Sequence, residues 1–512
     1  MAFISKFNLQ SSELSVIIAT LILIFLVRVI FSRPWNPSKL PLVNGKKWYE
    51  LGYGGVEKRF NADTKGLCQS GFQRGRQKSP DGFYLLTASR PTLVLPPKYA
   101  DILRNDSRLS LSRVTAAEFH ENLPLFEPLS YIVSDGRVIP KVITHKITRS
   151  LTSLIPRISS ETEHALQRVW KNEADWHQIS LRTSLDQIMA QIQSRVFLDD
   201  ELCRDPSWLQ ITIDITKTLF LAARALRGWP DFMKPYLAHI LPLCRKATAE
   251  LNEAERLLEP LVAKRRAALT SDIESDSDRL NTIDWFLDAS HESVLNIAYL
   301  QLGLSVVALE TTTEAVYNVL TDISSHPKAI HDLRAEIRGV IGKMGLNTSS
   351  IQKLELMDSV IKESQRMSPL GYFGMQRKAL DKIILPDGMI IPKNTFLTVS
   401  TLHMLDSSVW PNGEEYDPYR FYNMGVNGEK TPSNKFIHTS SNHMGFGHGK
   451  EACPGRFLAV NLIKTILCHI LVKYDFEVTG QEEYRREARG YNLIANQKLE
   501  INLKRHYEDF EL

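Results

Sequence analysis

A short loop around Cys453 constrains this chain more than any other feature. Residues 446–455 read FGHGKEACPG, and an apolar run over residues 457–472 follows them. Pro454 suits the first position of a helix, because a residue there needs no backbone N–H. A helix that begins here would direct its N-terminal amides and the positive end of its dipole at Cys453, and both favour a thiolate. A thiolate in this place acts either as a nucleophile or as a metal ligand.

The residues around this cysteine favour a metal ligand that belongs to a flat cofactor. Gly447 and Gly449 let the backbone approach the sulfur, and Phe446 can lie against a ring system. A phosphate-binding loop is excluded, because its spacing is wrong and Glu451 stands where Ser or Thr would bind magnesium. The paired ligands of a structural zinc module are missing as well. The remaining alternative is a buried structural cysteine.

The loop resembles the cysteine-ligand loop of the cytochrome P450s, the haem-thiolate monooxygenases, whose pattern is F-x-x-G-x-(R/H)-x-C-x-G. The matching residues are Phe446, Gly449, Cys453 and Gly455. The resemblance implies haem b, with Cys453 as the axial thiolate ligand of its iron. Glu451 departs from the pattern at a basic position that in the family helps to hold a haem propionate. An acid would repel that propionate.

A long apolar segment upstream carries a second part of the resemblance. Residues 291–325 have the length and apolar character of a buried central helix, and Pro327 would end it. Glu310, Thr311 and Thr312 interrupt its apolar middle, where polar groups are costly unless they serve something. The segment resembles the oxygen-activating helix of the family, which implies proton delivery by Glu310 and Thr311. The alternative is a Thr311 hydroxyl that bonds a carbonyl of its own helix.

Two further motifs follow in the order that the family shows. Glu363 and Arg366 lie at i and i+3 of a predicted helix over residues 357–367, where they can form a bidentate pair. They resemble the E-x-x-R motif, and the segment that ends at Arg420-Phe421 resembles the P-x-R-F motif. The resemblance implies a buried network of Glu363, Arg366 and Arg420 with a structural role.

Three more residues are candidates for holding the haem propionates. Arg377 resembles the strand arginine that reaches a propionate in the family. His145 and Arg149, at i and i+4 of a predicted helix, stand where the family has a Trp and an Arg with that task. The alternative for His145 and Arg149 is an exposed polar helix face.

The N-terminus has the features of a membrane anchor. Residues 14–31 form an apolar run of about 18 residues that only Arg28 interrupts, which is the lower limit for a transmembrane helix. Basic residues follow the run, so the rest of the chain should lie on the cytosolic side. We expect an anchor over residues 1–33, a proline-rich hinge over 34–50 and a catalytic domain over 51–512. The same arrangement resembles microsomal P450s, which implies the endoplasmic reticulum; the alternative is a cleaved signal peptide.

Composition bounds the remaining possibilities. A net charge of +4 over 512 residues gives no indication of nucleic-acid binding, and five scattered cysteines fit a reducing compartment. We predict a mainly α fold with a small β region. Residues 106–136 show little periodicity and should form a long loop, which in the family lines the substrate pocket. Residues 207–268 should form helices that cap this pocket, or an ordinary amphipathic pair.

Together these motifs imply an O₂-dependent monooxygenase that oxidises a lipophilic small molecule. Electrons should come from a separate NADPH-dependent flavoprotein reductase, because the chain has no flavin or nicotinamide domain of its own. The residue sequence of the cysteine loop and the N-terminal anchor resemble those of fungal members of the family. These members often act on terpenoids, indole alkaloids or polyketides of secondary metabolism. Two alternatives remain: an O₂-independent haem-thiolate isomerase or dehydrase, and a non-catalytic haem-binding sensor.

Overall fold

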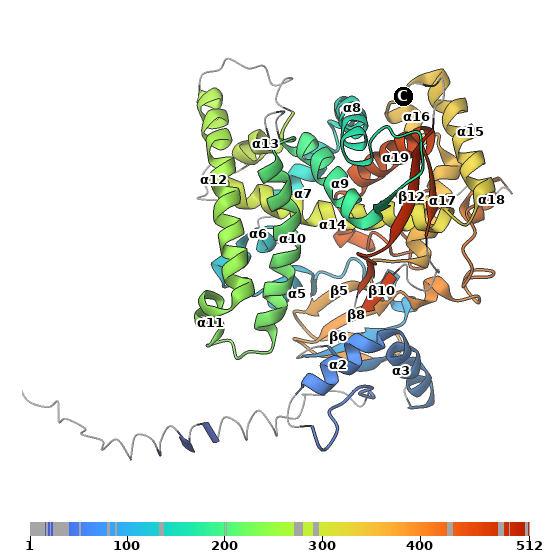
Figure 1. The fold of residues 1–512 in the computed structure, drawn as a ribbon. Coiled ribbons are helices and arrows are strands. Elements are labelled where there is room, and N and C mark those ends of the chain that lie inside the picture. Colours follow the sequence, from blue (N-terminus) through green and yellow to red (C-terminus); the bar gives the residue numbers. More distant parts are fainter. Residues whose placement is uncertain are drawn as a thin grey trace, which may run out of the picture.

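Helices make up most of this fold, and the strands form small sheets beside them (Figure 1). The computed structural model describes residues 40–50, 53–78, 82–87, 90–132, 138–198, 202–270, 280–289, 296–426, 434–479, 486–490 and 492–506, with a few isolated positions. The mainly α prediction is therefore confirmed for this part of the chain. The predicted anchor and residues 34–39 of the hinge lie outside it, apart from isolated positions. Among the described residues, no helix has both the length and the apolar character needed to cross a membrane.

The helix α14 (Ile297–Ile323) runs through the centre of the molecule (Figure 1). It begins six residues later than the sequence predicts, because the Asn296 side chain accepts a hydrogen bond from the Tyr299 amide and caps it. Pro327 opens the next helix, α15 (Pro327–Met344). Most of α14 is buried, as its apolar sequence requires. In its middle, however, residues 307, 308, 310 and 311 are partly accessible, and all four face an internal cavity.

Several long helices pack around α14. Those that contact it include α9 (Leu181–Phe197), α10 (Pro206–Arg227), α12 (Pro242–Thr270), α17 (Glu355–Met367) and α19 (Arg456–Lys473). Behind α19 lies α8 (Leu151–Trp170). The other helices are α2 (Gly54–Ala62), α3 (Thr64–Lys78), α4 (Ala100–Leu103), α7 (Val138–Val142), α11 (Lys234–Ile240), α13 (Thr282–Ala289), α16 (Thr348–Gln352) and α18 (Arg420–Val426).

The largest sheet has five strands in the order β1-β2-β8-β5-β3. They are β1 (Phe83–Thr87), β2 (Arg90–Leu95), β8 (Phe396–Ser400), β5 (Phe373–Ala379) and β3 (Leu109–Ser110). A short hairpin consists of β6 (Ile383–Ile384) and β7 (Ile390–Ile391). A three-stranded sheet joins β4 (His177–Ser180), β12 (Glu500–Arg505) and β9 (Tyr474–Val478), and β10 (Arg486–Arg489) pairs with β11 (Asn492–Ala495).

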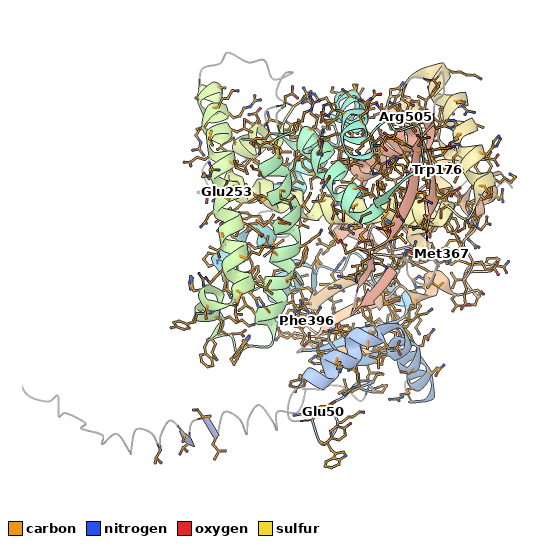
Figure 2. All side chains as sticks on the ribbon, in the orientation of Figure 1. Glu50, Trp176, Glu253, Met367, Phe396 and Arg505 are labelled. Atoms are coloured by element: carbon orange, nitrogen blue, oxygen red, sulfur yellow. The ribbon has the colours of Figure 1, made fainter. Side chains whose placement is uncertain are left out.

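The described part of the segment over residues 106–136, which ends at residue 132, does not form the long loop that we predicted. After β3 it folds into α5 (Ser112–Glu118), a 3₁₀ turn (Pro124–Phe126) and α6 (Glu127–Ser130). These helices are too short to show an amphipathic period in the sequence, and they are held by packing against the core. Both α5 and α10 contribute side chains to the cavity, so the predicted cover of the pocket is present. Figure 2 shows how densely side chains fill the space between the elements.

Candidate active site

The cysteine loop turns tightly, so that Cys453 faces the interior. Gly447 and Gly449 have φ values of 72° and 79°, which only glycine adopts without strain. The Cys453 amide donates to the Phe446 carbonyl at 2.8 Å and closes the turn. The helix α19 begins at Arg456 with Gly455 as its cap, so Pro454 precedes the helix and the predicted N1 position is wrong. The cysteine nevertheless stays next to the helix N-terminus, because only two residues separate it from α19.

The sulfur of Cys453 faces the cavity, yet it lies deep inside the protein. Burial raises the pKa of the Cys453 thiol, whereas the Gly455 and Arg456 amides and the Arg456 charge lower it. Burial is the larger effect, so the thiol keeps its proton until a metal cation in front of the sulfur displaces it. Amide donors around the sulfur are also what a thiolate ligand needs to be held in place.

The loop is anchored to the outside of α4. A Cβ atom at Gly449 would collide with the carbonyl oxygen of Arg104, so only glycine lets the two segments approach this closely. The buried His448 bonds through Nε2 to Asp101 Oδ1 at 2.9 Å, and the Lys450 amide donates to Asn105 Oδ1 at 2.9 Å. These contacts hold the loop from the side opposite the cavity.

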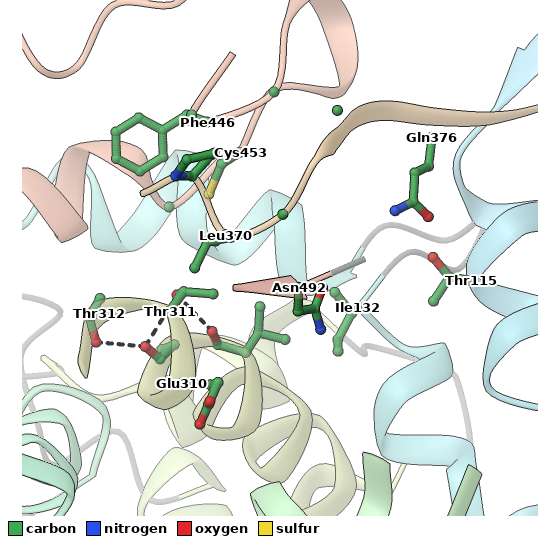
Figure 3. A pocket seen from close by; sticks show the side chains of 18 of the residues that line it. Thr115, Ile132, Glu310, Thr311, Thr312, Leu370, Gln376, Phe446, Cys453 and Asn492 are labelled. Carbon is green, nitrogen blue, oxygen red and sulfur yellow. Dashed lines mark hydrogen bonds between the residues drawn. The ribbon is translucent and has the colours of Figure 1, made fainter. Parts of the chain in front are cut away.

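One large cavity lies between this loop and α14. Its volume is about 1590 Å³, and Cys453, Phe446 and Thr311 line it together with residues from α5, α10, β5 and β11. Figure 3 shows Cys453 and Phe446 on one wall and Thr311 on the opposite wall. The cysteine loop and the middle of α14, which the sequence linked only through a family pattern, therefore line the same cavity.

Thr311 and Glu310 point to different sides of α14. The Thr311 hydroxyl donates to the Val307 carbonyl at 3.0 Å, as the back-bonding alternative predicts. Thr311 still lines the cavity, so its hydroxyl oxygen can accept a hydrogen bond from a donor there. The carboxylate of Glu310 points away from Cys453 (Figure 3) and donors on α9 hold it.

Two buried side chains on α9 hold this part of α14, and sequence reasoning missed both. Arg182 is 1% exposed and donates from Nη2 to Glu310 Oε2 at 2.7 Å. Arg182 also pairs with Asp186 at 2.9 Å and with Glu314. Gln193 Nε2 donates to Thr312 Oγ1 at 2.6 Å and to the Ala308 carbonyl at 3.2 Å. The only signal in the sequence is a charged pair, Arg182 and Asp186, at i and i+4 of a helix.

The predicted network behind the cavity is brought together in full. Arg366 donates from Nε and Nη2 to the two Glu363 oxygens at 2.8 Å each, in a bidentate pair. Arg420 Nε donates to Glu363 Oε1 at 3.0 Å. The side chains of Glu363 and Arg366 are 0% exposed, and that of Arg420 is 9% exposed. Further donors of both arginines bond backbone carbonyls of residues 411–415, so the network ties α17 to the segment before α18.

Comparison with known proteins identifies the family to which this chain belongs. The cytochrome P450 family model matches residues 136–505, which contain Cys453, Thr311 and the Glu363 network. The chain belongs to the cytochrome P450 family. Members of this family are haem-thiolate monooxygenases, and they bind haem b through a cysteine thiolate.

Similar proteins cover nearly the whole chain. The cytochrome P450 monooxygenase esdpI of Penicillium shearii is 36% identical over 95% of this chain and 96% of its own length. The cytochrome P450 monooxygenase pyr3 of Aspergillus fumigatus is 36% identical over 93% of this chain and 91% of its own length. The retinoic acid-bound structure of cyanobacterial CYP120A1 has a TM-score of 0.65 over 93% of this chain and 100% of that one. Its identity to this chain is 16%, so it shows a shared fold.

The residues of this P450 fit a haem between Cys453 and α14. Arg377 is 3% exposed and lines the cavity. Within the described residues, the one hydrogen bond of its side chain runs from Nη1 to the Gln376 carbonyl at 2.8 Å. Burial lowers the pKa of Arg377 to about 10, and the nearby Glu451 charge raises it. A buried guanidinium with so few partners needs an anion, and a haem propionate supplies one. The propionate would then share Arg377 with Glu451.

The other two propionate candidates lie elsewhere in this P450. His145 and Arg149 are exposed, and neither lines the cavity. His145 belongs to a π-helical turn (Ile143–Ile147) whose residue Ile143 does face the cavity. A spacing of i and i+4 places two residues on one face but does not decide which way that face points. The exposure of both side chains agrees with the alternative interpretation, in which they form an exposed polar surface.

Proposed function

We propose that this P450 oxidises a lipophilic small molecule, a terpenoid, indole alkaloid or polyketide intermediate of secondary metabolism, with O₂ and NADPH-derived electrons. The observation that carries the proposal is that Cys453 and Thr311 face each other across one cavity of about 1590 Å³. This volume exceeds what a cofactor alone would fill and leaves space for an apolar substrate. The fungal P450 monooxygenases that this chain resembles support the substrate classes by analogy.

The haem, when bound to Cys453, supplies the redox chemistry that activates O₂ and inserts one oxygen atom into the substrate. The chain's own residues bind and orient the reactants and move protons. Cys453 would hold the iron, and Arg377 would neutralise a propionate. Apolar side chains such as Val307 and Leu370 line the cavity and exclude water from it.

Proton delivery falls to Glu310 and Thr311. Glu310, which Arg182 holds at 2.7 Å, would feed protons toward the cavity through water. Thr311 Oγ1 presents a hydroxyl to the cavity and passes the proton on. This pair distinguishes a monooxygenase from an isomerase or dehydrase, because those reactions need no proton supply for O₂ reduction. A sensor would need neither the pair nor so large a substrate space.

The surface beside the cysteine loop suits a flavoprotein reductase. Ile143 lies about 4 Å from where a Cβ at Gly455 would be, so the turn that carries His145 and Lys146 borders the loop. Exposed basic residues, Lys141, Lys146 and Arg149, gather on and next to this turn. A basic surface attracts an acidic partner and steers its approach. Electrons delivered there would travel a short path to the sulfur.

We also propose that residues 1–33 anchor the protein in the endoplasmic reticulum membrane, with the catalytic domain of residues 51–512 facing the cytosol. Support comes from the apolar run of residues 14–31 and from bulky apolar side chains exposed on the described part. Trp48 is 95% exposed, and Phe232 and Tyr236 near α11 are 69% and 72% exposed. Aromatic residues of this kind favour the interfacial region of a bilayer.

The direct test of the proposed function is the thiolate ligation itself. The reduced protein with carbon monoxide should show the red-shifted absorption of a thiolate-bound haem, and Cys453→Ser should lose it. Cys468→Ser is the matched control, because Cys468 is buried in α19 and does not line the cavity. Product formation from a lipophilic substrate should require O₂, NADPH and reductase. A Cys453→Ser protein that kept the red-shifted band would overturn the assignment.

A further inference from the structure

The cavity carries neutral hydrogen-bonding side chains at the end away from Cys453. Figure 3 shows the amide of Gln376, from β5, and the hydroxyl of Thr115, from α5, on facing walls of this end. Asn492, at the start of β11, lines the same cavity. Near Cys453 and Thr311, by contrast, the cavity is lined by Leu370 and by aliphatic side chains of α14. Two neutral hydrogen-bonding side chains, Gln376 and Thr115, therefore lie at the end of the cavity away from Cys453.

An irregularity in β5 lies next to Gln376. Side chains of consecutive strand residues normally point to opposite faces. Here the pairing of β5 with β8 shifts register between Gly374 and Arg377, and Met375 has a φ of 49°. Gln376 and Arg377 follow this irregularity, and both line the cavity together with residues 373–375. The bond from Arg377 Nη1 to the Gln376 carbonyl at 2.8 Å fixes this backbone.

The polar groups at the distant end lack protein partners. Within the described residues, the side-chain amides of Gln376 and Asn492 form no hydrogen bond with another residue, and Thr115 Oγ1 has only a long contact of 3.4 Å to the Leu111 carbonyl. Polar groups at an apolar cavity bond either water or a ligand. An amide can donate and accept, so it suits a ligand hydroxyl and a ligand carbonyl equally.

The charges on the α5 and α10 walls are already matched by protein partners. Glu118 of α5 pairs with Arg90 and with Arg227. Lys217 of α10 pairs with Asp186 at 2.8 Å. Arg224, also on α10, lies 3.7 Å from Glu57. A charged ligand would lose its hydration and find no free counter-ion on these walls, which disfavours it against a neutral one.

We infer that the substrate is a neutral lipophilic molecule with a hydroxyl or carbonyl oxygen at the end remote from the oxidised carbon, and that Gln376 and Thr115 bind this oxygen. The inference rests on the proposed function, because it takes the oxidised carbon to lie at the Cys453 end. A ligand held at its far end presents a defined carbon to the reacting centre. Gln376 and Thr115 are then the residues that decide which carbon is oxidised.

The test measures equilibrium binding to the holoprotein by calorimetry, with probes that share a skeleton and differ in one polar group. The diterpene set is abietadiene, abietadienol and abietic acid, and the steroid pair is androstane and androstanol. In at least one set the alcohol should bind about 3- to 10-fold more tightly than its hydrocarbon, as one hydrogen bond allows. Abietic acid should bind more weakly than abietadienol, because the cations on the α5 and α10 walls already have protein partners.

Variants assign the preference to residues. Gln376→Leu and Thr115→Val keep side-chain volume and should each reduce the alcohol preference toward onefold. Gln352→Leu is the control, because Gln352 ends α16, is exposed and does not line the cavity. A preference that survives both cavity variants overturns the assignment. The absence of any alcohol preference in every set, or tighter binding of the acid, overturns the inferred substrate class.

The carbon monoxide spectrum separates this inference from the proposed function. Every variant should keep the thiolate-haem absorption, because neither Gln376 nor Thr115 touches Cys453. If the spectrum is normal but the alcohol preference is missing, only the substrate inference fails. If the spectrum is lost in the parent protein, the proposed function itself fails.

Discussion

Replacing Glu363 by glutamine removes one negative charge from a buried network and leaves its shape unchanged. In the parent, Glu363 accepts two bonds from Arg366 at 2.8 Å, one from Arg420 at 3.0 Å and one from the Asp417 amide at 3.0 Å. It is the only carboxylate that pairs with these two arginines within the described residues. The variant would leave two buried guanidinium groups with no anion.

The structure sets the size of the effect. Breaking a buried ion pair from one side costs about 3–5 kcal/mol. Backbone carbonyls such as that of Glu415 continue to accept from both arginines, so we expect the lower end, about 3 kcal/mol. For a protein of this size a loss of this order lowers Tm by about 3 °C. The urea midpoint should fall as well.

A second Glu–Arg pair at the same i, i+3 spacing is a matched control. Glu253 and Arg256 are paired on the surface of α12, where their side chains are 42% and 66% exposed. Glu253→Gln should cost less than about 1 kcal/mol, because water solvates both groups. Circular dichroism of both holoproteins during heating and in urea would compare the midpoints. Equal shifts for Glu363→Gln and Glu253→Gln would refute the argument from burial.

Three further predictions concern the site and the N-terminus. Thr311→Ala should lower product formation, by up to the ~10²–10⁴-fold that proton transfer contributes, while NADPH consumption continues and peroxide rises; unchanged product would favour the isomerase or dehydrase reading. Glu451→His should retain haem at least as well as the parent when apomyoglobin competes for it, because the acid repels a propionate; faster haem loss would show that Glu451 has a structural role of its own. Deleting residues 1–33 should release the protein from membranes while haem binding persists, and fractionation would show this. A deletion that still pellets would point to the exposed aromatic residues around α11.

Local sequence patterns predicted a large part of the fold and of the reacting centre. The apolar runs of α14 and α19 predicted long buried helices within a few residues of their true ends. Spacing alone predicted that Glu363 and Arg366 could pair, and the structure shows the pair. Such patterns are readable because helical neighbours are set by the sequence within one turn. The short helices of residues 106–136 were missed, because tertiary packing rather than periodicity stabilises them.

The sequence by itself determined which residues can carry the chemistry: a cysteine in a glycine-rich turn before a helix, and an acid and a hydroxyl in an apolar helix. Tertiary structure decided what stands around them. Arg182 reaches Glu310 across 128 positions of the chain, and the packing of β5 places both Gln376 and Arg377 at the cavity. His145 lies in a π-helical turn and Arg149 in the turn that follows it, and both side chains are exposed. The physical reason is that backbone spacing fixes which residues are near neighbours, whereas only the packing of distant elements fixes what each face meets.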